Sequence, residues 1–502
     1  MTERETDLQS FLSWFQRGGG RIDTSAMGFC YFSQAEGDRG AVALKDMPEG
    51  HVLFTIPRSL TLSTRNSSLP KLLGPRVWKE KRMDKGWAGL ILCMMWETAQ
   101  GLSSKWQEYL ETLPTTFETP MFWDGIDLEE LKGTYVVDKL GKEEAEKTYN
   151  ETLLPVVESR PDLFPADSIA VHYTLEQYHV MGSRILSRSF DVERWEGEEG
   201  NETEDSEVAD TSMGSAMDVD LPTSSSADNP NHEDPENENS DDEEEDEVDV
   251  SMVPVADLLN ARYGTENAKL FYEPTELKML TTKPVKAGEQ IWNTYGDLPN
   301  AKLLRRYGHV DVLELPGGGK GNPGDVVELR ADLVVSALPP TIPKSKVQEI
   351  IDWYLEEGGD DVLVFEADME LPSQLLTLIR LFLLSPEELK KVQDKGKLPK
   401  NKVDAPLLDI VIRALQMRMQ EYPTSIEDDE TLLTGDLSLK KRNAIFVRLG
   451  EKNILRGALQ NAEAIRSTLA EQPSDTKDKE KGGNKNKRKT SSDGPASKKS
   501  RR

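Results

Sequence analysis

The chain has 502 residues, of which 37% are hydrophobic and 30% charged, and its mean hydropathy is −0.57. This length accommodates two or three domains. The longest apolar run, residues 87–96, is about half as long as a bilayer-spanning helix, so we expect no transmembrane segment. The N-terminus lacks the apolar segment of a secretory signal. The two cysteines, Cys30 and Cys93, exclude a disulfide framework and a zinc cluster, which fits a reducing compartment.

The net charge of −29 is concentrated in one segment. Residues 193–250 contain 24 acidic residues against one arginine, a net charge of −23, so the other 444 residues carry only about −6. Residues 477–502 have the opposite character, with 11 basic side chains against 3 acidic ones. The folded part is therefore close to neutral, and the overall charge is a poor guide to its partners.

The first 190 residues divide into two parts. Residues 1–65 predict a short helix, ended by the glycines at 18–20, and then short strands separated by turns such as Met-Pro-Glu-Gly at 47–50. From 66 to 190 the apolar period becomes helical. Positions 106, 109, 110 and 113, for example, are apolar or aromatic at the spacing of one helix face.

The remaining sequence alternates between segments that can and cannot form a core. Residues 191–250 have too few apolar side chains to offset the entropy of folding, so we expect a disordered acidic insertion within a domain. Residues 251–313 return to strand-like sequence and end in a short helix, and residues 314–470 are dominated by helical periodicity. Residues 471–502 predict a basic, disordered tail.

Three short segments combine glycine with polar or aromatic residues at the ends of predicted strands. They are 37–40 (Gly-Asp-Arg-Gly), 257–260 (Asp-Leu-Leu-Asn) and 293–296 (Asn-Thr-Tyr-Gly), and a second Tyr-Gly pair follows at 307–308. Glycine lets a backbone approach a ligand closely. Each of the first two segments taken alone is more typical of an ordinary turn. The functional interpretation depends on their combination.

In combination, these segments resemble a SET domain. The order DLLN, AGEQIWNTYG and LLRRYG is similar to its carboxy-terminal half, and RGAVALKDMPEGHVLFTIPR is similar to its amino-terminal half. A helical insert between the halves, with SKWQEYLETLP and SRSF, resembles the branch that contains Rubisco large-subunit lysine methyltransferase. RNAIFVRLGEKNIL resembles the substrate-binding domain of that branch. The resemblance covers roughly residues 1–190 and 251–460, and its details point to the ribosomal-protein methyltransferases within the branch.

The resemblance implies an α+β fold, a split SET domain of short β-sheets with a helical insert, followed by an all-α substrate-binding domain. The halves of the SET domain are expected at 1–65 and 251–313, the helical insert at 66–190 and the substrate-binding domain at 314–470. The implied activity is S-adenosylmethionine-dependent protein-lysine N-methylation, and a metal ion is not implied. The expected protein is a monomer without a membrane partner or a direct requirement for nucleic acid.

The same resemblance assigns residues to the site. Tyr295 would be the catalytic side chain, which orients the methyl group and the amine. The cofactor would contact Gly37, Asp38, Arg39, Gly40, Arg188, Asn260, Ala261, Tyr295 and Tyr307. The substrate would contact Arg188, Phe190, Asp257, Tyr272 and Tyr307. From the residues alone, the aromatic side chains are equally typical of a core, and Asp257 of a turn.

One position departs from the family pattern. Most relatives have Asn-His where this chain has Asn260-Ala261. If this residue contacts the cofactor through its backbone, alanine serves as well as histidine, whereas activity would be lost if the imidazole were needed. The ribosomal branch shares the alanine, which marks a subfamily.

Alternatives remain for the acceptor and for the charged segments. The expected acceptor is a basic large-subunit ribosomal protein, with the forty-second as the first candidate, but a histone, a transcription factor or a histidine side chain also fits the fold. A non-catalytic acidic scaffold for basic proteins is a further alternative. The acidic insertion is either a solvated spacer or an attractor of basic substrates. The two basic clusters at 485–489 and 498–502 are typical of a nuclear localisation signal or of a nonspecific basic tail.

Overall fold

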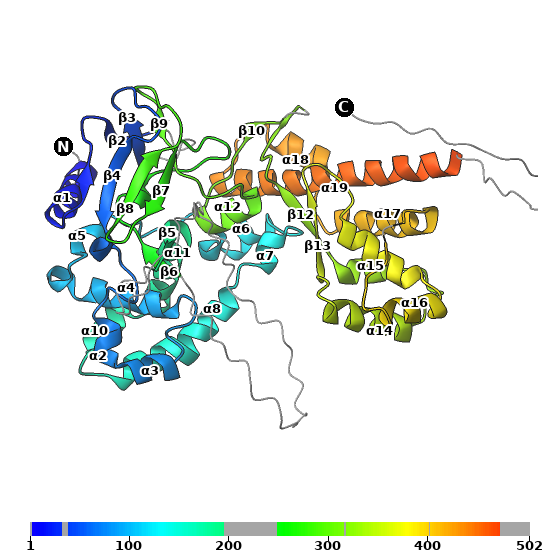
Figure 1. Cartoon of the computed structure of the whole chain (residues 1–502), viewed down its shortest axis with the longest axis horizontal. Helices are drawn as coiled ribbons and strands as arrows, with labels where there is room; N and C mark the ends of the chain where they lie inside the picture. Colours follow the sequence, from blue (N-terminus) through cyan, green and yellow to red (C-terminus); the bar gives the residue numbers. More distant parts are fainter. Residues whose placement is uncertain (1–2, 33–38, 195–247, 316–317, 401, 472–502) are drawn as a thin grey trace, which may run out of the picture.

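The computed structural model describes residues 3–32, 39–194, 248–315, 318–400 and 402–471. The expected acidic insertion lies almost entirely outside these ranges, and so does the basic tail. The chain folds into a mixed part of short sheets and helices, followed by a mainly helical part that ends in the long helix α19 (Leu439–Glu471) (Figure 1). The split SET architecture and the helical second domain are therefore confirmed.

Two small antiparallel sheets join the two halves of the sequence-split domain. The first has the order β1 (Arg21–Ile22), β4 (Val52–Pro57), β8 (Glu276–Thr281) and β7 (Ala268–Tyr272). The second has the order β2 (Met27–Tyr31), β3 (Arg39–Ala43) and β9 (Gln290–Ile291). The pairs β4–β8 and β3–β9 each connect strands more than 200 residues apart, so neither half completes its sheets without the other.

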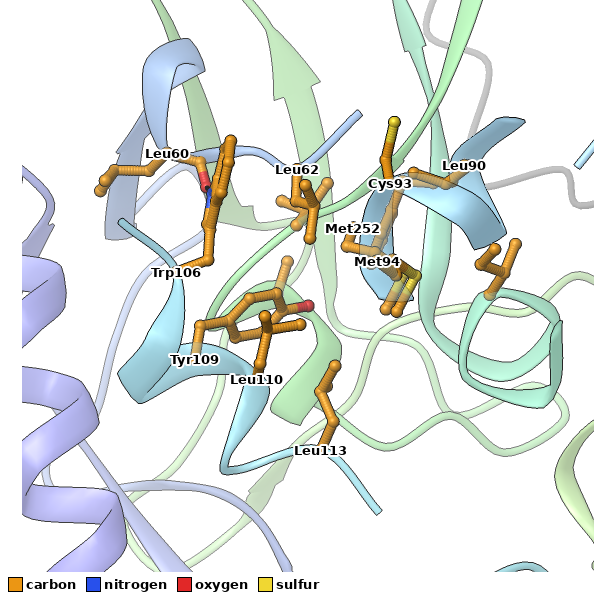
Figure 2. Close-up of a cluster of buried hydrophobic side chains, with 14 of the residues drawn as sticks. Leu60, Leu62, Leu90, Cys93, Met94, Trp106, Tyr109, Leu110, Leu113 and Met252 are labelled. Atoms are coloured by element: carbon orange, nitrogen blue, oxygen red, sulfur yellow. Dashed lines mark hydrogen bonds between the residues drawn. The ribbon is translucent and has the colours of Figure 1, made fainter. Parts of the chain in front are cut away.

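The helical insert supplies about half of the buried residues of the first core. Its helices are α2 (Leu69–Leu73), α3 (Pro75–Glu80), α4 (Ala88–Ala99), α5 (Gln107–Leu110), α6 (Gly125–Glu129), α7 (Tyr135–Asp138), α8 (Lys142–Thr148), α9 (Leu154–Ser159), α10 (Ala166–His172) and α11 (Leu175–Arg188). Helix α4 is apolar all round because it is surrounded by other elements. Figure 2 shows its Leu90, Cys93 and Met94 beside Leu62 and Met252, which come from the two sheet-forming halves.

The predicted stripe at 106–113 is buried, but it forms only one helical turn. Trp106, Tyr109, Leu110 and Leu113 are all at most 5% exposed. Helix α5 ends at Leu110, where the side chain of Thr112 donates a hydrogen bond to the carbonyl of Tyr109 and Pro114 follows two residues later. The four side chains are therefore buried as the spacing predicts, although the helix itself is only one turn long.

The second domain has its own core and one structural addition to the expected helices. Its helices are α13 (Ala331–Ser336), α14 (Lys344–Glu356), α15 (Ser373–Leu383), α16 (Pro386–Gln393), α17 (Ala405–Met419), α18 (Ile426–Leu432) and α19. A two-stranded antiparallel sheet, β12 (Val326–Arg330) with β13 (Val362–Glu366), packs against α19 and its neighbours. Before it, β10 (Leu313–Glu314) pairs with β11 (Lys320–Gly321). The short predicted helix after the second SET half is α12 (Asn300–Tyr307).

The acidic insertion leaves and re-enters the fold through one hairpin. Strand β5 (Ser189–Glu193) pairs with β6 (Val248–Met252), and the last pair before the insertion is Glu193 with Val248. The sequence-based bounds of 191–250 were therefore too wide, because three residues at each end are paired strand. They were missed because these strands carry acidic residues that match the composition of the insertion. In the described part of the chain, no helix is long and apolar enough to cross a membrane.

The hairpin predicts how the insertion can be removed. Replacing 195–246 by Asn-Gly, a sequence that favours a tight turn, joins Arg194 to Glu247 in the register of β5 and β6. We expect this variant to unfold within a few degrees of the full chain in a thermal melt. As a contrast, removing 191–250 deletes the paired strand ends and the buried Val192 side chain, whose burial is worth about 1.5–3 kcal/mol. Equal melting temperatures for the two deletions would contradict this account of the boundary.

Candidate active site

A small pocket lies where the end of α11, strand β5 and the second SET half meet. It is lined by Ser187, Arg188, Ser189, Phe190, Ala256, Asp257, Leu259, Asn293 and Tyr295. Four of the residues assigned from the sequence, Arg188, Phe190, Asp257 and Tyr295, are therefore brought together. They come from two segments that the acidic insertion separates, so the fold alone unites them.

Arg188 and Asp257 form the polar wall of the pocket. Arg188, the last residue of α11, donates through Nη1 to the backbone carbonyl of Asp257 at 2.7 Å. Within the described residues, neither Nε of Arg188 nor Oδ1 of Asp257 has a hydrogen-bond partner, although both atoms are buried. Such atoms are costly to bury unless a ligand satisfies them. The wall is therefore equipped to bind a polar group.

The backbone before Asp257 is strained. Val255 has φ of +75°, a conformation that a β-branched residue rarely adopts, and the 3₁₀ turn at Ala256–Leu258 begins directly after it. This turn places the carboxylate of Asp257 in the pocket, where its side chain is buried. Burial raises the pKa of Asp257, and the nearby Arg188 guanidinium opposes this effect only in part.

Two aromatic rings stack beside the pocket. The rings of Tyr295 and Tyr307 are 4.1 Å apart between centroids and only 4° from parallel. Tyr307 is the last residue of α12, and Gly308 ends that helix with φ of +77°. Burial raises the pKa of both phenols, so both are neutral at physiological pH. Tyr307 is thus connected to the pocket through the ring of Tyr295 and does not line it directly.

Asn260 connects the pocket to strand β3. Its side-chain amide donates to Oε1 of Gln290 at 2.8 Å and to the backbone carbonyl of Arg39 at 3.1 Å. Its backbone carbonyl accepts from Asn293 at 2.9 Å, and the neighbouring Ala261 forms a bridge with the same residue. A backbone bridge makes no demand on the side chain, which is compatible with alanine at 261.

Gly40 makes this close approach possible. A Cβ atom at position 40 would lie 2.6 Å from both the Asn260 amide nitrogen and Oε1 of Gln290. No side chain fits there without displacing these groups. Gly40 of β3 and the side chains of Asn260 and Gln290 that pack on it form a cradle, in the segment to which the resemblance assigns cofactor contacts.

The other assigned residues have different outcomes. Gly37 and Asp38 lie outside the described residues. Tyr272, at the end of β7, does not line the pocket. Its ring packs against the first core, and its phenol lies within electrostatic range of Asp191 and Glu193. It was assigned from the family resemblance, and an aromatic side chain is equally typical of a core.

Several residues of the site were not assigned individually from the sequence, among them Asn293, Gln290 and Tyr109. Asn293 lines the pocket, and Gln290 holds the Asn260 amide. The hydroxyl of Tyr109 donates to Oδ2 of Asp257 at 3.0 Å. Gln290 and Asn293 lie within the segment AGEQIWNTYG, so its polar positions carried a signal, whereas Tyr109 is indistinguishable from its core neighbours. No group of three potential metal ligands occurs in the ranges that the structure describes.

Comparison with known proteins supports this picture. Residues 346–455 match the family described as Rubisco LSMT substrate-binding. Ribosomal lysine N-methyltransferase 4 of Saccharomyces cerevisiae is 28% identical over 348 residues, which cover 68% of this chain and 61% of the yeast protein. Human N-lysine methyltransferase SETD6 is 26% identical over 454 residues, 84% of each chain.

A solved structure shows the same architecture over nearly the whole chain. It is described as the SET domain of LSMT bound to lysine and AdoHcy, and it aligns with a TM-score of 0.63 at 20% identity, covering 93% of each chain. This chain therefore has the fold of the Rubisco large-subunit methyltransferase branch of SET-domain proteins, with a split SET domain followed by the substrate-binding domain of that branch.

Proposed function

We propose that this chain is an S-adenosylmethionine-dependent protein-lysine N-methyltransferase. The observation that carries the proposal is the pocket itself, in which the neutral phenol of Tyr295 and the unpartnered carboxylate oxygen of Asp257 line one small buried space. The similar proteins named as lysine N-methyltransferases support it. The solved structure with bound lysine and AdoHcy supports the same acceptor and cofactor.

The reaction requires a neutral amine in a fixed direction. A lysine side chain has a pKa of about 10.4 in water and is therefore charged before it enters. Oδ1 of Asp257 attracts the ammonium group to the pocket. The apolar side chains of Phe190 and Leu259 lower the pKa of the amine as water is excluded, so its proton leaves with the departing water before the methyl transfer. When bound, S-adenosylmethionine supplies the electrophilic methyl group and a positive charge that disfavours a neighbouring ammonium.

The remaining groups orient the reactants. The phenol of Tyr295 is held by its stack on Tyr307, so it donates or accepts a hydrogen bond from one fixed position beside the amine. Gly40 and Asn260 hold the cofactor cradle open, and the guanidinium of Arg188 suits a carboxylate. Fixing both reactants in line accounts for much of the acceleration expected of such a site.

We further propose that the acceptor is a basic large-subunit ribosomal protein, with the forty-second as the first candidate. The similarity to ribosomal lysine N-methyltransferase 4 supports this choice, and so does the acidic segment 193–250, whose net charge of −23 attracts a basic protein. The basic clusters at 485–489 and 498–502 lie outside the described residues and support a nuclear location, where ribosomal proteins are assembled. A monomer is proposed on the same family resemblance.

Labelled S-adenosylmethionine tests the acceptor. We expect label on a basic protein when the chain is incubated with free proteins extracted from purified large ribosomal subunits, and mass spectrometry identifies the band. The rate should fall steeply with salt, because the Debye length decreases from about 10 Å at 0.1 M to about 3 Å at 1 M. Label on histones or actin alone would refute the ribosomal acceptor and leave the methyltransferase. Cofactor binding without any transfer would favour the acidic scaffold.

The Tyr295→Phe variant tests the catalytic role. Because the phenol acts on the reacting groups more than on the bound cofactor, we expect kcat to fall at least tenfold while the dissociation constant of S-adenosylmethionine changes by less than about threefold. Calorimetry and single-turnover transfer give the two values. Tyr149→Phe is the control, since it removes another buried phenol, whose hydroxyl donates to the carbonyl of Tyr173. Full activity of Tyr295→Phe would exclude the phenol from the mechanism.

A pair of glycine variants tests the cofactor cradle. Gly40→Ala places a methyl group 2.6 Å from the Asn260 amide, so we expect S-adenosylmethionine affinity to fall by tenfold or more. Gly28→Ala is matched to it, because Gly28 lies on the neighbouring strand β2 and its Cβ would meet only Leu44 at an ordinary 3.5 Å. We expect Gly28→Ala to bind the cofactor normally. Equal losses in the two variants would show that the strands, and not the cradle, are perturbed.

A further inference from the structure

The ring of Tyr109 lies in the first hydrophobic core, whereas its hydroxyl contacts a residue that lines the pocket. Its side chain has no solvent exposure, and Figure 2 shows its ring within the first hydrophobic cluster. Two aromatic residues of α1 (Glu3–Arg17) fix the ring from outside. Trp14 stacks on it at 6.2 Å and 8° from parallel, and Phe11 lies at 5.8 Å. The phenol therefore has one available position.

That position is at the carboxylate of Asp257. The hydroxyl of Tyr109 donates to Oδ2 at 3.0 Å, and both groups are buried. The backbone that carries this side chain is further fixed, because the main-chain carbonyl of Asp257 accepts from Nη1 of Arg188. The second oxygen, Oδ1, has no partner among the described residues, and Asp257 lines the pocket. One oxygen is thus held by the core, and the other remains for a ligand.

We propose that Tyr109 is a positioning residue, which holds the carboxylate of Asp257 so that its second oxygen receives the ammonium group of the incoming lysine. This inference rests on the proposed function, since it names a residue that acts on the same pocket. Tyr109 does not touch the substrate. It acts through Asp257, and α1 contributes to substrate binding by keeping the phenol in place.

The charges around the carboxylate give the proposal a distinctive pH dependence. Burial raises the pKa of Asp257, whereas Arg188 from α11, the hydrogen bond from Tyr109 on α5 and Arg39 from β3 lower it. Arg184 faces the phenol of Tyr109, and the phenol of Tyr295 lies near the carboxylate. Removal of the Tyr109 hydroxyl takes away a stabilising donor, so the pKa of Asp257 rises. The carboxylate then loses its charge at a higher pH.

The test compares Tyr109→Phe with Tyr149→Phe in the full chain. Each variant removes one buried phenol hydroxyl from the same hydrophobic core, and only the first one contacts Asp257. The probe is Nα-acetyl-L-lysine amide, titrated calorimetrically in the presence of saturating S-adenosylhomocysteine over a pH series. We expect Tyr109→Phe to weaken probe binding about three- to tenfold and to move its acid limb to higher pH. Tyr149→Phe should change neither.

A double-mutant cycle separates positioning from a general loss of structure. Asp257→Asn removes the charge, so adding Tyr109→Phe to it should weaken the probe no further if the phenol acts only through the carboxylate. Additive losses, equal effects of Tyr109→Phe and Tyr149→Phe, or weakened S-adenosylhomocysteine binding in Tyr109→Phe would each overturn the proposal. If the wild-type chain transfers no methyl group yet binds the probe in a Tyr109-dependent manner, the proposed function fails and the positioning role stands.

Discussion

The site depends on one polar contact, the approach of the Asn260 amide to strand β3. This contact joins residues that are 221 positions apart, and it exists only because Gly40 leaves room for it. The same amide is held by Gln290 at the start of β9, the strand that pairs with β3. Ordering a loop of this length costs entropy, which the buried core of both halves must offset. The cofactor cradle is consequently a product of the whole domain.

Asp257 shows how burial and function balance in the pocket. A buried carboxylate with one unpartnered oxygen is unfavourable, and the strained backbone at Val255 adds to the cost. The fold tolerates both because Arg188 and Tyr109 satisfy the remaining hydrogen-bonding capacity of this residue. Groups of this kind accumulate where a ligand completes the network. The lining combines these polar groups with the apolar side chains of Phe190 and Leu259, which suits the proposed binding of an amine.

The sequence predicted the fold well where local pattern and composition determine it. The split domain, the helical insert and the helix that ends at Tyr307 follow from periodicity and from the family resemblance. The strands β5 and β6 were not distinguished from the acidic insertion, because two strands that pair across 54 intervening residues have no local sequence signature. For the site, Arg188, Asp257 and Tyr295 come together as expected. Tyr109 was not assigned to the site, because only its hydroxyl contacts Asp257. Its ring follows the apolar spacing of a core residue.

Helix α12 connects the contact between the two domains to the pocket. A small cluster packs α7 and α12 against α19, with Val136, Leu304 and Val447 among its buried members. Around it, Lys440 and Lys441 of α19 pair with acidic residues of α6 and its end at 2.8 and 2.7 Å. Ion pairs that remain in contact with solvent add little stability individually, so the buried cluster carries most of this contact. Since α12 ends in Tyr307, which stacks on Tyr295, this helix connects the domain that would hold a protein substrate to the phenol that would orient its lysine.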